Sequence, residues 1–155
     1  MLPRWIVWEE GTFPSTSGQY EITLSEKTVW VYYKDKSIWT SEKDVKVQKA
    51  LFADIDRDGQ NELILLCWRK GHYGDVKPIW VKEEAKDWVQ HIFVYELMQK
   101  GVQAKWMSSY IGKDIVDISV EADEKSGSLL GLTDRSGGES VWRWEDWGFT
   151  RVDIP

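Results

Sequence analysis

Apolar and polar residues alternate with a period of two along most of the chain, in short runs separated by turn residues. This alternation is typical of half-buried β-strands, whereas no long helical period occurs and the best helix candidate is the short stretch at 82–88. The pattern predicts strands at residues 20–24, 29–33, 37–40, 45–53, 62–68, 91–97, 102–107, 115–120, 129–132, 140–144 and 148–152. Because the connections are short, we expect an antiparallel all-β meander in a single domain, residues 1–155.

The chain also contains an internal repeat. An aromatic-Val-Tyr strand occurs at residues 30–32 and again at 93–95, and each copy is followed by a Trp, Trp39 in the first and Trp106 in the second. A third aromatic strand at 141–144 begins the same hairpin. Repeats of this kind indicate stacked supersecondary units. We expect a first repeat at about 28–90, a second at about 91–139 and the start of a third at 140–155.

Composition narrows the function classes. The 155 residues include 11 Trp, 6 Tyr and 4 Phe, and aromatic residues favour strands. The formal net charge is -6 and no Lys/Arg block occurs, which argues against nucleic acid as a partner. No stretch approaches the roughly 20 apolar residues of a membrane span. Cys67, the single cysteine, follows an apolar run, so we expect a buried and unreactive thiol.

Residues 54–62 read DIDRDGQNE and combine four carboxylates with a central glycine. Alternate residues of a tight loop direct their side chains to one centre, and calcium binds about six to eight oxygen ligands in flexible geometry. Gly59 permits the sharp turn. Without a cation, the four carboxylates would repel one another. We therefore predict a calcium (Ca2+) site whose ligands are the side chains of Asp54, Asp56, Asp58 and Glu62 and the backbone carbonyl of Gln60.

This loop differs from an EF-hand, because Leu65 stands where an EF-hand has its bidentate acid. The chain therefore leaves the loop in a strand. A plain polar hairpin turn is the alternative interpretation, since Asp-Arg-Asp-Gly is good turn chemistry. Magnesium fits less well, because it keeps several waters and rarely uses an all-protein loop. In the second repeat the corresponding stretch, residues 121–129, has Lys125 and Leu129 in place of two acids, and we expect no calcium there.

The strand–DxDxDGxxE–strand unit resembles the calcium-binding repeat of FG-GAP and VCBS-like bacterial β-propeller proteins. The resemblance extends over about residues 28–149 through Trp68, a Gly- and Tyr-containing loop, the Val-Tyr strand and the Trp-Met-Ser-Ser segment at 106–109. It implies about two and a half propeller blades, in a partial or assembling propeller, with calcium in a structural role. A β-sandwich or open barrel is the alternative. The resemblance also implies an extracytoplasmic location, although residues 1–10 lack the apolar core of a signal peptide.

The longest irregular segment, residues 69–90, is rich in aromatic residues. Exposed rings stack on sugars, peptides or a protein partner, whereas buried rings would pin the loop. The candidate binding residues in and next to this segment are Trp68, His72, Tyr73, Trp80 and Trp88.

We expect a non-enzymatic, calcium-stabilised interaction or scaffolding domain, with a protein or glycan as partner and possible self-association through open β edges. No nucleophile-elbow motif, zinc-ligand cluster or phosphate-binding loop occurs in the sequence. The rival hypothesis is a carbohydrate-active enzyme or a carbohydrate-binding module that uses the aromatic segment 68–90.

Overall fold

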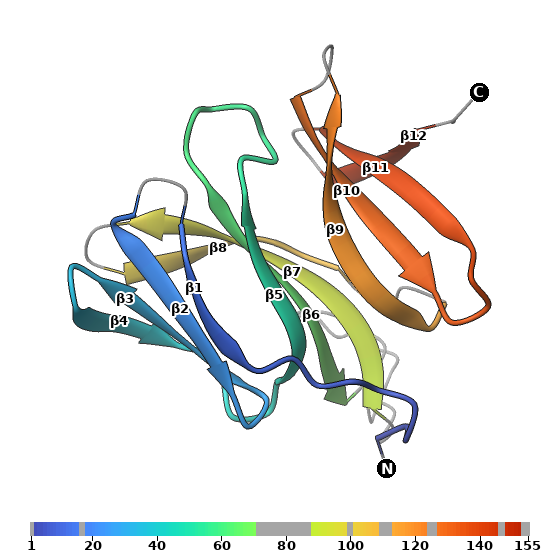
Figure 1. Cartoon of the computed structure of the whole chain (residues 1–155), viewed down its shortest axis with the longest axis horizontal. Helices are drawn as coiled ribbons and strands as arrows, with labels where there is room; N and C mark the ends of the chain where they lie inside the picture. The colour runs from blue at the N-terminus through green and yellow to red at the C-terminus, as the bar shows by residue number, and fades with distance from the viewer. Residues whose placement is uncertain are drawn as a thin grey trace, which may run out of the picture.

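The computed structural model describes residues 2–15, 18–70, 88–98, 101–108, 113–123, 127–145 and 148–152. These residues form twelve β-strands arranged in three four-stranded antiparallel sheets. In Figure 1 the central sheet, drawn in green and yellow, stands between the first sheet, in blue, and the last sheet, in orange and red. No helix in the described part of the chain has the length and hydropathy of a membrane span. The all-β class and the antiparallel meander are therefore confirmed.

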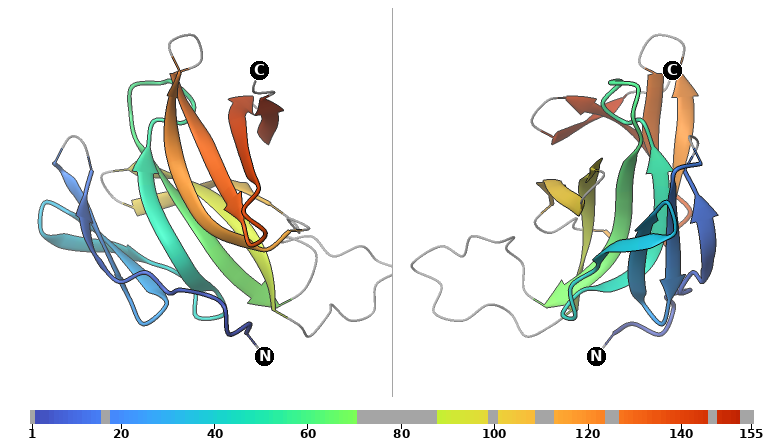
Figure 2. Two further views of the ribbon diagram at one scale, coloured as in Figure 1. Left: turned by 45° about the vertical axis from the view of Figure 1, so that its right-hand side comes forward. Right: turned by 90° about the vertical axis from the view of Figure 1, so that its left-hand side faces the viewer.

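The strands follow one another in chain order within each sheet. Sheet A consists of β1 (Gly11–Pro14), β2 (Tyr20–Ser25), β3 (Thr28–Tyr33) and β4 (Lys36–Thr40). Sheet B consists of β5 (Lys46–Ala53), β6 (Glu62–Lys70), β7 (Trp88–Met98) and β8 (Gly101–Met107). Sheet C consists of β9 (Ile115–Asp123), β10 (Gly127–Asp134), β11 (Glu139–Glu145) and β12 (Gly148–Val152). The left view of Figure 2 shows the same side-by-side arrangement.

The eleven predicted strands correspond to β2 through β12, with ends that differ by a few residues. Strand β1 was not predicted, because GTFP is short and combines a glycine with a proline. Pro14 is compatible with its place, since β1 is an edge strand of sheet A. Strands β6 and β7 reach Lys70 and Trp88, so the irregular segment is shorter than the predicted 69–90. Residues 71–87, with all of the predicted helix except Trp88, lie outside the described residues.

The internal repeat has a structural counterpart in the strand registers. Val31 pairs with Trp39 between β3 and β4, and the register shifts immediately after Val31. Val94 pairs with Trp106 between β7 and β8, and the register shifts immediately after Val94. The predicted repeats begin at residues 28, 91 and 140, close to the starts of β3, β7 and β11, the third strand of each sheet. The hydrogen-bonded sheets are thus offset from the sequence repeats by about half a sheet.

The repeated Trp residues join neighbouring sheets. Trp39 of sheet A contacts Tyr95 of sheet B with ring centroids 4.8 Å apart. Trp106 of sheet B contacts Trp144 of sheet C with centroids 6.2 Å apart and nearly perpendicular planes. In both contacts a Trp on the fourth strand of one sheet meets an aromatic ring on the third strand of the next. Both Trp residues therefore pack between neighbouring sheets.

Sheet B is buried on both faces. Leu63 and Leu65 of β6 belong to a cluster shared with sheet A, whereas Ile64 and Leu66 belong to a cluster shared with sheet C. A strand covered on both sides is expected to be continuously apolar, which explains the Leu-Ile-Leu-Leu run. Burial of each such side chain stabilises the fold by about 1.5–3 kcal/mol. The central sheet therefore holds its two neighbours in place.

A buried polar network fixes sheet C against sheet B. The Gln90 side chain accepts a hydrogen bond from the Ile115 amide and donates to the Ile115 carbonyl, both at 2.8 Å. It also donates to Gln48 Oε1 at 2.9 Å, which accepts a second hydrogen bond from Trp68 Nε1 at 2.8 Å. Because buried amides are stable only when they are paired, this network sets where β9 begins.

The N-terminal segment, residues 2–10, covers the edge of the central sheet at β5. The Glu9 amide donates to the Gln48 carbonyl at 2.9 Å, and Glu9 Oε1 accepts from the Ala50 amide at 3.2 Å. Trp5 packs edge-on against Trp68 with centroids 5.8 Å apart. The segment thereby pairs backbone groups that an open sheet edge would expose.

Candidate metal centre

The predicted metal loop connects β5 to β6 and is a hairpin connection of the central sheet. Ala53 pairs with Glu62 at its base, so Glu62 is already the first residue of β6. Arg57 and Gly59 have positive φ angles of 65° and 86°. The left-handed conformation is readily adopted by glycine, while for Arg57 it is a departure that the loop must hold in place.

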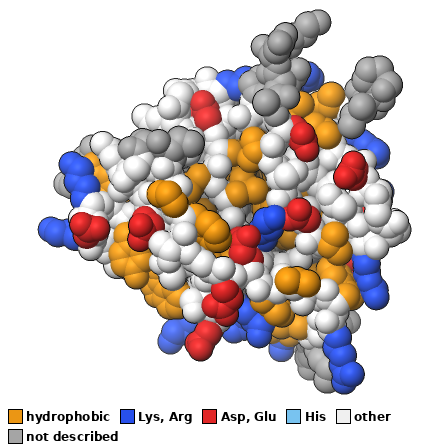
Figure 3. All heavy atoms as spheres, viewed as in Figure 1, with side chains coloured by type: hydrophobic (Ala, Val, Ile, Leu, Met, Phe, Trp, Pro, Cys, Tyr) orange, Lys and Arg blue, Asp and Glu red, His pale blue; other side chains and the backbone are white. Residues whose placement is uncertain are grey.

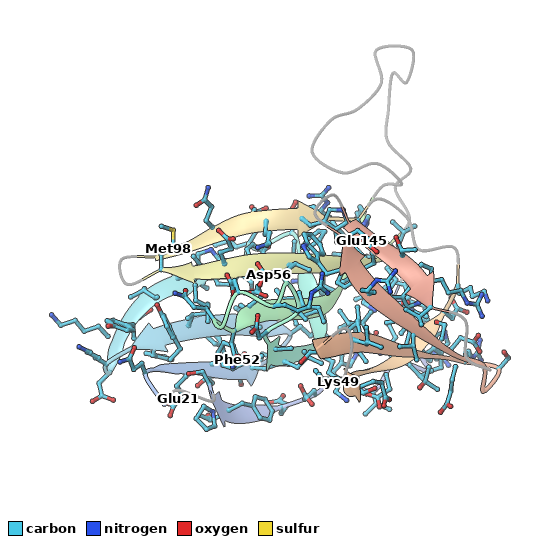
Figure 4. The ribbon with its side chains drawn as sticks, turned by 90° about the horizontal axis from the view of Figure 1, so that it is seen from above. Glu21, Lys49, Phe52, Asp56, Met98 and Glu145 are labelled. Atoms are coloured by element: carbon cyan, nitrogen blue, oxygen red, sulfur yellow. The ribbon has the colours of Figure 1, made fainter. Side chains whose placement is uncertain are left out.

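The loop brings all four predicted acidic ligands together. Asp54, Asp56, Asp58 and Glu62 each offer a carboxylate oxygen, and these atoms lie within 4.8 Å of one another. Asp58 is exposed, Asp54 and Asp56 are half-buried, and Glu62 is only 1% exposed. The group therefore forms a cup that is closed toward the protein by Glu62 and open toward solvent at Asp58. Figure 4 shows Asp56 in the middle of the molecule, seen from above.

Backbone amides of the loop hold the carboxylates in place. Asp54 accepts hydrogen bonds from the amides of Asp58 at 3.1 Å and Gly59 at 2.9 Å. Glu62 Oε1 accepts from the amides of Ile55 at 3.0 Å and Asp56 at 3.3 Å. Asp54, at the start of the loop, therefore binds the backbone at the tip. Glu62, at the end of the loop, binds the backbone immediately after Asp54. These bonds fix the positions of the oxygens before any cation is bound.

Gln60, the predicted backbone ligand, is exposed at the tip of the loop. Its amide donates to Asp58 Oδ1 at 2.8 Å, which orients the Asp58 carboxylate. The role of the Gln60 carbonyl stays a prediction.

A lysine from a distant strand also reaches the acidic group. Lys105 on β8 donates to Asp56 Oδ2 and, at 2.8 Å, to Glu96 Oε1. Its ammonium group lies 5.8 Å from the centre of the Trp144 ring. Sequence reasoning missed Lys105, because it is far from the loop in the chain and no motif includes it. On the face shown in Figure 3, acidic and basic side chains are interspersed.

The pKa values of three carboxyl groups in the cup are shifted, and not all in the same direction. Burial, together with the charge of Asp56, raises the pKa of Glu62 to about 8. Burial and the neighbouring acids also raise the pKa of Asp58. For Asp56, burial is the largest single effect and acts to raise the pKa, but the hydrogen bonds with Lys105, Asp58 and Glu62 and the charge of Lys105 together outweigh it, so the pKa is lowered. A cup in which some acids resist ionisation is one that a divalent cation would stabilise strongly.

The donor set fits a hard cation. All four side-chain donors are carboxylates, the ligand type that calcium and magnesium prefer. One buried and three more accessible acids leave a solvent side for water ligands. Lys105 is the feature that departs from a pure metal site, because it supplies one positive charge to Asp56. A bound cation would therefore share Asp56 with Lys105 or displace it.

The loop is connected to sheet C as well as to its own sheet. The Arg57 guanidinium donates to the Trp144 carbonyl at 3.1 Å. The ring of Trp144 is 3% exposed and packs against Trp106 and Phe149, with centroids 6.2 and 5.2 Å away. The acidic loop thus lies at the junction where sheets B and C meet.

The corresponding corners of the other sheets differ. The β1–β2 connection of sheet A closes through Ser15, whose hydroxyl accepts from the Tyr20 amide at 3.2 Å, and residues 15–19 contain no acid. In sheet C the connection between β9 and β10, residues 124–126, lies outside the described residues. The expectation of no calcium there stays a prediction. Within the part of the chain that the structure describes, the loop of sheet B is the one group of at least three potential metal-binding side chains.

The predicted aromatic binding residues are distributed differently from the expectation. Trp68 is 3% exposed and donates to Gln48, so its ring belongs to the interior and presents no face to a ligand. Trp88 is half-buried in β7 with the Lys70 ammonium 5.4 Å from its ring centre. His72, Tyr73 and Trp80 lie outside the described residues, and their roles stay predictions. Trp68 was grouped with the irregular segment because the strand 62–68 was predicted to end at this residue, whereas β6 continues to Lys70.

The chain matches no protein-family model, and no curated protein and no solved structure shows significant similarity to it.

Proposed function

We propose that this chain is a non-enzymatic interaction or scaffolding domain whose β-sheets are stabilised by calcium bound at the acidic loop of sheet B. The observation that carries the proposal is the convergence of four carboxylates from nine residues, with ligand oxygens within 4.8 Å of one another. Asp54, Asp56, Asp58 and Glu62 would bind through their side chains and Gln60 through its carbonyl. A water molecule would complete a coordination number of about six.

Charge repulsion supports the proposal. Two carboxylates about 4 Å apart repel each other by about 1 kcal/mol in water and by about 4 kcal/mol near a protein surface of lower effective dielectric. Several such pairs occur in the cup, and Lys105 offsets only part of their charge. A divalent cation would remove the repulsion and add coordination energy, so metal binding would be coupled to stability of the folded state.

The sheets themselves support a structural role for the metal. Each is a four-stranded antiparallel meander that packs face to face with its neighbour, as the blades of a β-propeller do. We propose that sheets A, B and C are three blade-like units of a partial propeller, fewer than the roughly 4–8 blades of a closed ring. Calcium would then hold the β5–β6 hairpin of the central unit.

Thermal unfolding with calcium or with the chelator EGTA tests the metal site. At a calcium concentration about 100 times the Kd, stabilisation is about 2.7 kcal/mol. For a chain of this size that raises the melting temperature by about 5–11 °C. The double variant Asp54→Ala with Asp56→Ala should lose the shift, while Glu42→Ala with Asp44→Ala, which removes two exposed acids elsewhere, should keep it.

An equal melting temperature of the unaltered protein in calcium and in EGTA would refute the proposal. If magnesium at the same concentration produced the full shift, the site would be a general divalent site and the assignment to calcium would be wrong.

A further inference from the structure

The shared register of sheets A and B allows their faces to be compared position by position. Tyr32 of β3 pairs with Glu21 of β2, and the corresponding Tyr95 of β7 pairs with Leu63 of β6. Within each strand, side chains two residues apart lie on the same face. The face of sheet B that contains Leu63 and Tyr95 packs against sheet A. The matching face of sheet A, which contains Glu21 and Tyr32, is turned away from sheet B.

This outward face of sheet A differs from the matching face of sheet B. It has polar residues where sheet B has aliphatic ones, and aromatic residues at the same positions as sheet B. On β6 the packed face carries Leu63, Leu65 and Cys67, and on β2 the same positions carry Glu21, Thr23 and Ser25. On β3, by contrast, Trp30 and Tyr32 stand where β7 has Phe93 and Tyr95. Polar outer faces are expected on the terminal unit of a stack. Two half-buried aromatic rings on such a face indicate a surface for a ligand that is both polar and ring-shaped.

A hollow is present at one end of this face. Its volume is about 570 Å³ and it lies between the β1–β2 connection and the β3–β4 turn. That size is within the range of small-molecule sites. Glu21, which Figure 4 shows at the outer side of sheet A, belongs to its lining. The lining side chains with hydrogen-bonding groups are Gln19, Glu21, Thr23, Tyr32, Lys34 and Asp35.

The chemistry of the lining is that of a sugar site. Tyr32 offers a ring on which the C–H face of a pyranose can stack. The carboxylates of Glu21 and Asp35 accept hydrogen bonds and the ammonium of Lys34 donates them. The hydroxyl of Thr23 is paired with that of Thr12 at 3.2 Å and keeps a lone pair to accept a further hydrogen bond. With one cation against two anions, the lining lacks the dense negative charge that a polycation would need, and its mixture of donors and acceptors suits a neutral hydroxyl-rich ligand. We infer that this hollow binds a neutral oligosaccharide, with Tyr32 as the stacking platform.

The inferred site is separate from the acidic loop. The loop belongs to sheet B and reaches sheet C through Arg57, whereas the hollow belongs to the far face of sheet A. Saccharide binding should therefore be the same in calcium and in EGTA at a temperature where the protein is folded in both. The two proposals can fail independently.

The test is isothermal titration calorimetry of the full chain with hexasaccharides. The sugars are glucose (β-1,4- and α-1,4-linked), N-acetylglucosamine, mannose and xylose. We expect at least one to bind with a Kd at or below about 1 mM. Tyr32→Thr should weaken that binding by about tenfold or more. Glu21→Gln and Asp35→Asn should weaken it by about threefold or more, since each keeps the shape and loses a charged acceptor.

Lys36→Gln is the matched control, because Lys36 is exposed in the same hairpin and does not line the hollow. Asn is tolerated at residue 35, where φ is 69°, so the Asp35 variant should fold. Unchanged thermal unfolding of the Glu21 and Asp35 variants separates binding from folding. Absence of binding to every hexasaccharide would overturn the inference. Unchanged binding in the folded Glu21 and Asp35 variants, or salt-sensitive binding of oligolysine without any saccharide, would also overturn it.

Discussion

Lys105→Met offers a sharp test of how charge is balanced at the acidic loop. The change removes the ammonium group that binds Asp56 and Glu96 while keeping an apolar stem next to Trp144. Without a metal, Asp56 then loses its cation and the repulsion within the cup increases. With calcium bound, the metal supplies that charge. The variant should therefore be much less stable than the unaltered protein in EGTA and only slightly less stable in calcium.

The magnitude follows from the burial of the partners. A hydrogen bond to a charged group contributes about 1.5–3 kcal/mol, and isolating a fully buried charge costs about 3–5 kcal/mol. The side chains of Lys105 and Asp56 are 17% and 11% exposed, while Glu96 is 44% exposed and well screened. We therefore expect a loss of about 2 kcal/mol in EGTA, at the low end of these ranges. For a chain of this size the melting temperature falls by about 4–8 °C.

The assay is thermal unfolding of both proteins in calcium and in EGTA, read as a thermodynamic cycle. Lys49→Met is the matched control, because Lys49 pairs with Asp117 across sheets B and C at a more exposed site, 28% and 49% exposed. The Lys49→Met variant should lose less than about 1 kcal/mol of unfolding free energy, and the same amount in both buffers. If Lys105→Met lowers the melting temperature equally in calcium and EGTA, the lysine and the metal do not share a charge, and the reasoning is wrong.

Four further predictions concern single features of the fold. Because the pKa of Glu62 is raised to about 8 from 4.5, its contribution to metal-free stability is full below pH 4.5 and lost as the pH rises through 8, so the calcium-induced rise in melting temperature should be larger at pH 8 than at pH 6. Cys67 is fully buried and its thiol pKa is raised by burial, so a disulfide reagent should react with it only after unfolding in urea. Gln90→Leu should lower the free energy of unfolding by about 3 kcal/mol in a urea titration, because it leaves three buried hydrogen bonds broken. Glu26→Asn with Lys27→Gly should raise it by about 1 kcal/mol, since both residues have positive φ angles in the β2–β3 turn.

Local alternation was enough to predict most of the fold. Strands β2 to β12 were found because each alternates or is strongly apolar, and their turns contain residues that favour turns. The repeat was visible because Trp39 and Trp106 make the same contact with the next sheet. The Leu-Ile-Leu-Leu run of β6 contained a further signal, because its alternate residues pack against different neighbouring sheets. Such a run is expected when both faces of a strand are covered.

The candidate site was predictable where it is local and not where it is assembled from distant residues. The four acids stand close together in the chain, and their spacing alone brought them to one cup. Lys105 comes from β8 and Arg57 reaches sheet C, and both contacts depend on how the strands pair and pack. Trp68 was misassigned for a related reason, because its burial depends on Gln48, a residue of another strand.

The position of the acidic loop gives calcium a role beyond one hairpin. Arg57 extends from the loop to the Trp144 carbonyl, and Lys105 connects Asp56 with the ring of the same Trp144. The ring of Trp144 in sheet C also contacts the ring of Trp106 in sheet B. A cation that fixed the backbone around Arg57 would therefore fix the hydrogen bond from Arg57 to sheet C. Under the proposed function, calcium should slow hydrogen exchange of the β11 amides as well as those of the loop, whereas the β2 amides of sheet A should exchange at the same rate with or without the metal.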